Sequence, residues 1–269
     1  MHGVAPRMCD QVAGPLLGGG AGGRSPGFLF KATMLAAWSD PTDNQLCRRR
    51  LARRPAMWLM ALAVAAGAAM PADAETLRKV LASPLVEEGS EPDGCTPAIS
   101  GLGGPSAWEV RIERLLLDGK ALVEVSRQAE PYRFPLCIAD RPVVRNAEVE
   151  LAFVPHDGGM ARAAGVVLRF IDPQDFYVVE ADAAAGTVRF ARVVNGERRE
   201  IAGRPAPLVL GKAHTLKIKA MDESFAVSLD GKDLLAARDS LIAVPGRFGL
   251  WSRADSRTSF GDLFITLLD

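Results

Sequence analysis

The second half of the chain, Gly165–Asp269, is a succession of short segments in which apolar and polar residues alternate, separated by turn dipeptides. Alternation places successive side chains on opposite faces of a strand, so each segment is typical of a half-buried β-strand. Asn195-Gly196 and Asp230-Gly231 readily adopt the positive φ angles of tight hairpin turns. No helical periodicity of useful length interrupts the run. The pattern therefore predicts an all-β fold built as an antiparallel sandwich.

The same alternation reaches upstream to Trp108, and we expect about ten to twelve strands, the number typical of a sandwich or barrel. Because Pro135 lacks a ladder donor, we expect the strand that contains it to lie at a sheet edge. The expected strands are Trp108–Ile112, Ala121–Ser126, Tyr132–Ile138, Asn146–Val154, Gly165–Ile171, Phe176–Glu180, Thr187–Val194, His214–Ala220, Phe225–Leu229, Arg247–Ser252 and Ser259–Leu267.

The first 74 residues have the pattern of a targeting region rather than of a fold. A basic cluster, Arg48–Arg54, precedes the charge-free run Met57–Met70 and the small-residue sequence Ala72-Asp73-Ala74. This order is typical of a secretory signal peptide, and the run is shorter than the ~20 residues that cross a bilayer. We therefore expect export to the periplasm or beyond, with no stable membrane span after cleavage; an uncleaved anchor is the alternative.

The chain divides into four parts on this basis. Residues 1–56 are a non-globular extension, rich in Gly and Ala, that we attribute to an upstream mis-start, with a long disordered leader as the alternative. Residues 57–74 hold the apolar core and cleavage site of the signal peptide. Residues 75–107 form an N-terminal arm, with a short helix expected at Thr76–Leu85. Residues 108–269 form the jelly-roll domain.

Charge excludes one class of partner. The segment before Glu75 holds eight basic and four acidic residues, which leaves 24 basic and 28 acidic residues in the exported part, a net charge near −4. Phosphate contacts need clustered Lys and Arg, and this part has no basic run. We therefore expect no nucleic-acid partner.

Two cysteines, Cys95 and Cys137, remain in the exported part. An even number in an oxidising compartment favours a disulfide, which would tie the N-terminal arm to the sandwich. Two free buried thiols are the alternative. A metal site is disfavoured because no Cys-x-x-Cys pattern or histidine pair accompanies them.

Three segments, Ala163–Ile201, His214–Leu235 and Gly246–Ile265, resemble the concanavalin-A-like lectin/glucanase superfamily. Within it, they are most similar to the laminin-G-like jelly-roll domains of the 3-keto-disaccharide-hydrolase-like and family-16-hydrolase-like branch. The resemblance spans roughly Trp108–Leu268. It implies two antiparallel sheets, one of them concave, with sugars, peptides or calcium bound at the concave face or the loop rim.

The motifs of known enzymes are incomplete in this chain. A family-16 glycosidase needs Glu-x-Asp-x-Glu, or the same with one extra spacer, so that alternation brings its carboxylates to one face. Glu180-Ala-Asp182 supplies two of the three, but alanine stands at 184 and 185, the two places open to the second catalytic Glu. No Gly-x-Ser-x-Gly elbow is present in the exported part either, and we expect its two histidines, His156 and His214, to be structural or solvated.

Binding without catalysis calls for an aromatic face that stacks on a sugar ring. Trp251 ends a strand beside Arg253 and Asp255, so we name it as the candidate anchor, a core tryptophan being the alternative. Arg169 and Glu180 lie on adjacent expected strands, and we include them as candidate ligand contacts. The alternative for these two residues is a solvated charge ladder with Arg189 and Lys217.

Calcium is the one cofactor to consider, and only as a structural ion. In several jelly-roll modules an Asp at the start of the final strand binds calcium, and Asp262 stands in a comparable place. Its other oxygen ligands are not identifiable from the sequence.

We therefore expect an exported binding module without catalysis, with a glycan as the favoured ligand. A glycoside hydrolase or lyase whose carboxylates lie on different strands is one alternative. A factor that binds an envelope protein is the other.

Overall fold

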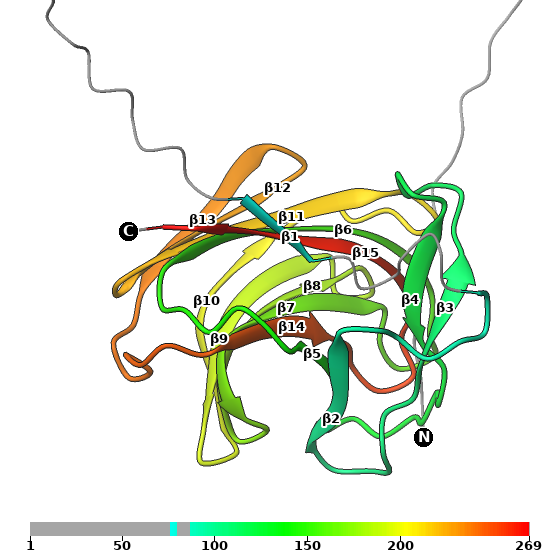
Figure 1. Ribbon diagram of the computed structural model, residues 1–269, viewed down its shortest axis with the longest axis horizontal. Coiled ribbons are helices and arrows are strands. Elements are labelled where there is room, and N and C mark those ends of the chain that lie inside the picture. Colours follow the sequence, from blue (N-terminus) through cyan, green and yellow to red (C-terminus); the bar gives the residue numbers. More distant parts are fainter. Residues whose placement is uncertain (1–75, 80–86, 269) are drawn as a thin grey trace, which may run out of the picture. The chain divides into compact units, whose positions relative to one another are not determined.

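The computed structural model describes residues 76–79 and 87–268, which all belong to one compact unit. Within these residues there are fifteen β-strands and no helix, and the strands form two antiparallel sheets (Figure 1). The expected all-β, two-sheet sandwich is therefore confirmed, as is the architecture implied by the resemblance to the concanavalin-A-like superfamily. The extension and signal peptide expected in residues 1–74 lie outside the described residues. No helix among the residues described is long and apolar enough to cross a membrane.

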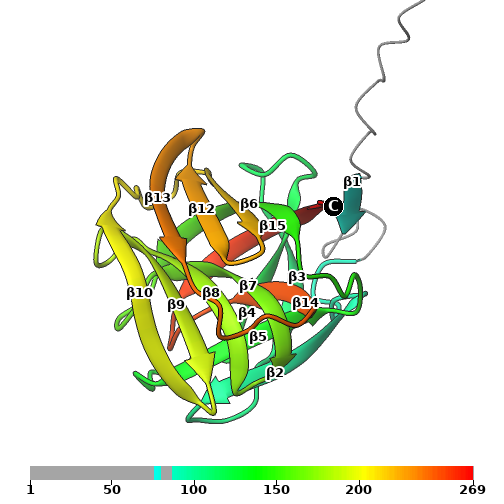
Figure 2. The same cartoon turned by 90° about the vertical axis from the view of Figure 1, so that its left-hand side faces the viewer.

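One sheet has eight strands and the other has seven. The first runs β13 (Lys232–Arg238), β12 (Ser224–Leu229), β11 (His214–Met221), β6 (Ala147–Asp157), β15 (Arg257–Leu267), β4 (Lys120–Glu124), β3 (Trp108–Ile112), with β1 (Thr76–Lys79) also paired to β15. The second runs β10 (Glu197–Pro205), β9 (Thr187–Val194), β8 (Asp175–Asp182), β7 (Ala163–Asp172), β14 (Arg247–Trp251), β5 (Arg133–Ala139), β2 (Cys95–Gly101). Figure 2 shows the second sheet in this order, from β10 to β2.

The main core fills the space between the two sheets. Strand β6 contributes Val149, Leu151 and Phe153, while its intervening residues Glu148 and Glu150 are only half-buried. This is the period-two pattern from which the strand was predicted, and it follows from the pleat, which turns successive side chains to opposite faces. Each fully buried large apolar side chain of this kind contributes about 1.5–3 kcal/mol relative to exposure.

The two tight turns predicted from dipeptides are confirmed. Asn195 and Gly196 join β9 to β10 with φ angles of 52° and 78°. Asp230 and Gly231 join β12 to β13 with 51° and 75°. Positive φ at both central residues matches the twist of the flanking strands.

The N-terminal arm differs from expectation in two ways. Thr76–Lys79 is a strand rather than the start of a helix, because it pairs with Leu263–Thr266 of β15, and this tertiary pairing overrides local propensity. Residues 80–86 lie outside the described residues. The strand that contains Pro135 is also not at an edge, because β2, from the arm, pairs along it as the outermost strand.

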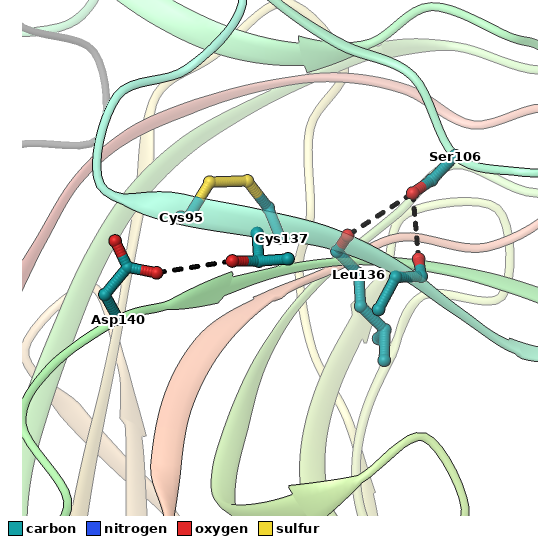
Figure 3. Close-up of a disulfide and its surroundings, with 7 residues drawn as sticks. Cys95, Ser106, Leu136, Cys137 and Asp140 are labelled. Atoms are coloured by element: carbon teal, nitrogen blue, oxygen red, sulfur yellow. Dashed lines mark hydrogen bonds between the residues drawn. A yellow bond between two sulfur atoms is a disulfide. The ribbon is translucent and has the colours of Figure 1, made fainter.

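The arm is held by the expected disulfide. Cys95 of β2 and Cys137 of β5 are bonded, with their Cα atoms 5.5 Å apart and a sequence separation of 42. In the chain-entropy model a loop of this length stabilises the fold by about 4 kcal/mol. Figure 3 shows the bond beside Ser106, whose hydroxyl donates to the carbonyl of Ala98 at 2.8 Å. The disulfide and this hydrogen bond together anchor β2 to the sandwich.

Candidate functional site

The outer face of the seven-stranded sheet, the face turned away from the main core, is also apolar. A second buried cluster draws all its members from this sheet, at positions that alternate with those facing the main core. Its members are Leu136, Ile138, Ala163, Val167, Phe170, Phe176, Val178, Ala191, Val193 and Trp251. This face therefore differs from a sheet face open to water, which is usually polar.

A groove of about 430 Å³ lies beside this apolar cluster, and Phe134 both packs against the cluster and lines the groove. Tyr132, just before β5, has 65 % of its surface exposed. Beside this ring lie one carboxylate and three guanidinium groups. The lining residues are Gly101, Pro131, Tyr132, Phe134, Glu180, Arg189, Gly196, Arg198 and Arg253.

A buried carboxylate organises the charged side of the groove. Arg198 Nη2, from β10, donates to Glu180 Oε2 at 2.6 Å. Arg253 Nη1, from the segment between β14 and β15, lies 3.6 Å from Glu180 Oε1. Only 2 % of the Glu180 side chain is exposed, and a buried carboxylate needs a counter-charge. Two guanidinium groups, from opposite sides of β8, supply it. Burial raises the pKa of Glu180 above its ordinary value, and the charges of Arg198 and Arg253 oppose that shift.

Strand register explains why Glu180 and Arg189 lie next to each other on the outer face. Leu136, Trp251, Gly165, Glu180 and Arg189 are successive Cα partners across β5, β14, β7, β8 and β9. They therefore form one row on the outer face. The row begins with Leu136 and Trp251 of the buried apolar cluster and ends with the charged residues Glu180 and Arg189.

The aromatic side of the groove is fixed by backbone contacts. The amide of Leu102 donates to the carbonyl of Tyr132 at 2.8 Å. Gly101 has a φ of 80°, and a Cβ on it would lie 2.0 Å from the same carbonyl oxygen. Only glycine fits here, and it lets the turn after β2 approach the chain at Tyr132.

Trp251 does not present the face expected of a ligand anchor. It is 1 % exposed and stacks on Phe134, with ring centroids 5.5 Å apart. Its partner on β7 is Gly165, where a Cβ would lie 3.0 Å from Trp251 Cε3. The missing side chain leaves room for the indole, which the sequence pattern did not reveal. Trp251 is thus part of the buried apolar cluster and does not line the groove.

The other candidate residues separate into two groups. Arg253 and Glu180 lie together in the groove, as described above. Asp255 instead accepts backbone N–H groups of Gly159 and Met160 at 2.8 and 2.9 Å. Burial alone would raise the pKa of Asp255, but these bonds and one from Ala161 lower it below its ordinary value. Its role in this structure is to hold the loop between β6 and β7.

Arg169 is fully buried and does not line the groove. Its guanidinium donates to the carbonyls of Arg145, Ile242 and Asp222 at 2.9, 3.0 and 2.6 Å. It also lies 5.1 Å from the ring centroid of Phe225, in the main core. Lys217 belongs to the other sheet, on β11, so the charge ladder considered as the alternative does not form.

Asp262 lies within β15 rather than at its start, because the strand begins at Arg257. Its side chain is buried, with 9 % exposed. In the part of the chain that the structure describes, no group of three or more His, Cys, Asp or Glu residues could hold a metal ion. A structural calcium ion at Asp262 stays a prediction.

Arg253 lies close to both carboxylates of the incomplete glycosidase motif, Glu180 and Asp182. Asp182 follows Glu180 on the same face of β8, and Arg253 Nη1 lies 3.7 Å from Asp182 Oδ2 and 3.6 Å from Glu180 Oε1. Both carboxylates are buried rather than solvated, contrary to expectation for a strand end. Asp182 Oδ1 also accepts the amides of Ala184 and Ala185 at 2.8 and 3.3 Å. Both carboxylates therefore serve as counter-charges for Arg253, and Asp182 also fixes the turn after β8.

A larger hollow, about 1090 Å³, lies on the outer face of the eight-stranded sheet and contains a Ser–His–Glu cluster. His156 Nε2 is 2.8 Å from Ser259 Oγ and 3.0 Å from Glu113 Oε2, and Ser259 donates to Glu113 at 3.0 Å. A catalytic relay needs the carboxylate on Nδ1, so that Nε2 can take the serine proton. Here both partners contact the same nitrogen, which is the geometry of a closed hydrogen-bond triangle.

His214, the other histidine of the sandwich, is structural, as expected. It is buried; its Nδ1 lies 2.8 Å from Asp230 Oδ2, and its Nε2 accepts the amide of Val209 at 3.0 Å.

Sequence reasoning missed Tyr132 and Arg198 as groove residues. Tyr132 was visible as one of two tyrosines in the chain, next to a proline at the start of a strand. Arg198 stands in β10, whose sequence has no alternation because both its faces are largely exposed. Arg198 is paired with Val193 of β9, and its long side chain reaches along the outer face of the sheet to Glu180.

No model of a protein family matches the sequence, and no curated protein matches it. Among solved structures, the chain is similar to the carbohydrate-binding module CBM66 from Bacillus subtilis, with 23 % identity, 61 % of this chain and 92 % of that chain covered, and a TM-score of 0.49. A protein of unknown function with a galectin-like fold from Bacillus subtilis has 11 % identity, 64 % and 89 % coverage and a TM-score of 0.46. The exoplasmic/lumenal domain of VIP36, in its Ca²⁺-bound form, has 13 % identity, 60 % and 84 % coverage and a TM-score of 0.44. The role of the groove must therefore be inferred from its own residues.

Proposed function

We propose that the protein is an exported saccharide-binding module and that the groove beside Tyr132 is its binding site. The observation that carries the proposal is an exposed aromatic ring next to buried and half-buried charged groups in one groove. A sugar ring has an apolar C–H face, which stacks on an aromatic ring, and an edge of hydroxyls, which exchange hydrogen bonds with charged side chains. The groove supplies both kinds of contact on one side of the molecule.

Pre-organisation supports the same proposal. Tyr132 is held through its backbone, and Arg198 and Arg253 are drawn towards a carboxylate that they share. Groups fixed before binding lose little conformational entropy when a ligand arrives. The groove can therefore bind a saccharide with few contacts.

The glycoside hydrolase alternative requires two carboxylates free to act as acid and as base or nucleophile. Glu180 and Asp182 are the one same-face carboxylate pair beside the groove among the described residues, and Arg253 lies close to both. This favours binding over hydrolysis, and the experiment below includes a readout for both.

The test is a glycan array probed with the full chain, with Tyr132→Ala and Leu117→Ala beside it. Leu117 is a matched control, because its side chain is 95 % exposed and lies between β3 and β4, in the other sheet. Loss of one stacking contact should weaken binding about tenfold in Tyr132→Ala and leave Leu117→Ala unchanged. Bound oligosaccharides are then examined by mass spectrometry for shortened products.

Three outcomes would count against the proposal. A folded chain that binds no saccharide on the array would leave the protein-binding alternative. Binding that survives in Tyr132→Ala would place the site elsewhere on the molecule. Shortened products that disappear in Glu180→Gln would instead establish the hydrolase alternative.

A further inference from the structure

We propose that the groove selects acidic saccharides, whose sugar rings carry carboxylate groups, over neutral ones. This inference rests on the proposed saccharide-binding function and names the class of ligand. It follows from the charge that the groove presents, from the hydrogen-bond donors that remain available there, and from the geometry of the guanidinium group.

The charges of the groove are unevenly exposed. The side chains of Arg189, Arg198 and Arg253 are 29 %, 26 % and 30 % exposed, whereas Glu180 is 2 % exposed. These are the only charged residues among those that line the groove in the described part of the chain. The surface met by a ligand is therefore cationic, and the carboxylate beneath it serves to gather the cations.

The guanidinium groups are anchored but not saturated. Arg253 Nη1 lies 3.6 and 3.7 Å from its two carboxylate neighbours, distances that are too long for hydrogen bonds. Among the described residues, the Nε atoms of Arg198 and Arg253 have no hydrogen-bond partner but are buried, so a ligand would meet the terminal nitrogens of these side chains, which are 26 % and 30 % exposed. Arg189 Nε likewise lies 3.6 Å from Glu200 Oε2. A guanidinium group has five N–H donors, so each arginine can still bind an acceptor.

The chemistry of these donors favours a carboxylate as acceptor. Guanidinium is planar and presents paired N–H groups that match the two oxygens of a carboxylate. Such charge-assisted bonds are about twice as strong as those between neutral groups. A saccharide whose ring stacks on Tyr132 and whose edge carries a carboxylate would use both sides of the groove. A neutral saccharide would offer the three guanidinium groups only uncharged acceptors, whose hydrogen bonds are weaker.

The experiment compares two probes that differ in charge alone. The full chain is titrated calorimetrically with oligogalacturonate and with its methyl ester, which keeps the same rings and linkages. Oligogalacturonate should bind at least about tenfold more tightly, because it alone supplies a charged acceptor. Its affinity should fall as salt is raised, while that of the methyl ester should not.

Matched variants locate the effect. Arg253→Gln and Arg189→Gln should each weaken oligogalacturonate binding about tenfold, and should weaken binding of the methyl ester clearly less, because the ester offers these side chains only uncharged acceptors. Arg199→Gln serves as the control, since Arg199 is exposed, neighbours Arg198 on β10 and does not line the groove. Two variants are used because Arg253 lies within 4 Å of two buried carboxylates, whereas the carboxylate of the Arg189 ion pair, Glu200, is exposed.

The outcomes distinguish this inference from the function on which it rests. Equal binding of the two probes would overturn the preference for acidic saccharides and leave saccharide binding intact. Tight binding of a sulfated galactan, with none of oligogalacturonate, would overturn the choice of carboxylate. If the array finds no saccharide ligand of any charge, the proposed function fails together with this inference.

Discussion

Arg133 and Glu124 form an ion pair that is shut away from solvent at the start of β5. Arg133 Nη2 lies 3.1 Å from Glu124 Oε1, and the two side chains are 0 % and 1 % exposed. The same guanidinium donates to Ser126 Oγ at 2.6 Å and to the carbonyl of Pro105 at 2.9 Å. Arg133 also directly follows Tyr132, so the pair fixes the chain that presents the aromatic side of the groove.

Replacing Arg133 by methionine should therefore be strongly destabilising. The variant leaves Glu124 as a buried charge without its cation, which costs about 3–5 kcal/mol in free energy of unfolding. Urea denaturation measures this loss. Arg111→Met is the matched control: its pair with Glu109 is exposed, so the expected loss is below about 1 kcal/mol. Equal losses in the two variants would contradict the role given to the buried pair.

Trp251 shows that the burial of a single residue cannot be predicted from its neighbours in the sequence. Its position beside Arg253 suggested an exposed anchor, but its exposure depends on the side chains that lie next to it on neighbouring strands. Those neighbours are Gly165 on β7 and Leu136 on β5, 86 and 115 positions away in the chain. Burial of this kind is decided by register between distant strands, which no local pattern records.

At the scale of elements, Gly165 is the clearest test of how the buried apolar cluster around Trp251 is packed. Its φ is not positive, so alanine would be tolerated there in open space. A Cβ at Gly165 would, however, lie 2.8 Å from the carbonyl oxygen of Val179 and 3.0 Å from Trp251 Cε3. We expect Gly165→Ala to lower the free energy of unfolding by about 1–3 kcal/mol, the usual cost of overpacking, and to displace the indole.

Chemical denaturation and tryptophan fluorescence check this prediction together. Gly231→Ala is the control, since a Cβ added at Gly231 would meet no atom within 4 Å and the residue has a φ of 75°. It should cost about 1 kcal/mol through backbone strain alone and leave the fluorescence spectrum unchanged. An unchanged spectrum in Gly165→Ala would mean that the glycine does not set the position of Trp251.

Elements were predictable from the sequence to the extent that their signals are local. Alternation located β3 and β9 at their observed bounds, and the Asn-Gly and Asp-Gly dipeptides located two hairpin turns. β10 was missed because an edge strand exposed on both faces does not alternate. The groove was only partly predictable, because its residues come from several strands or their flanking segments and converge only through the order of the sheet.

At the scale of the whole molecule, Tyr177 links the two sheets. From β8 of one sheet, its ring packs against Phe225 of β12 in the other, with centroids 4.9 Å apart. Its hydroxyl donates to Asp239 Oδ1 at 2.6 Å and accepts the amide of Ile242 at 3.0 Å. Asp239 also pairs with Arg192 of β9. One side chain thus joins both sheets to the connection between β13 and β14.

This arrangement predicts how stability depends on alkaline pH. Burial, together with the hydrogen bond to Asp239, raises the pKa of Tyr177 from 10.0 to about 12. Because the folded state keeps the proton more tightly, the associated stability is fully present below about pH 10 and is lost as pH rises towards 12. At about 1.4 kcal/mol per unit of pKa, the loss should reach roughly 1.4 kcal/mol at about pH 11.

Urea denaturation at neutral pH and at about pH 11 measures this loss, with Tyr177→Phe as the comparison. The phenylalanine variant keeps the ring between the sheets but has no phenol to ionise. It should start less stable, since Asp239 and the amide of Ile242 lose a partner, and should then lose about 1.4 kcal/mol less than the natural chain over the same pH range. Tyr132→Phe separates the two tyrosines, because Tyr132 is exposed and its hydroxyl does not link the sheets. If the natural chain and Tyr177→Phe lose stability in parallel, the phenol of Tyr177 is not what ties the sandwich to pH.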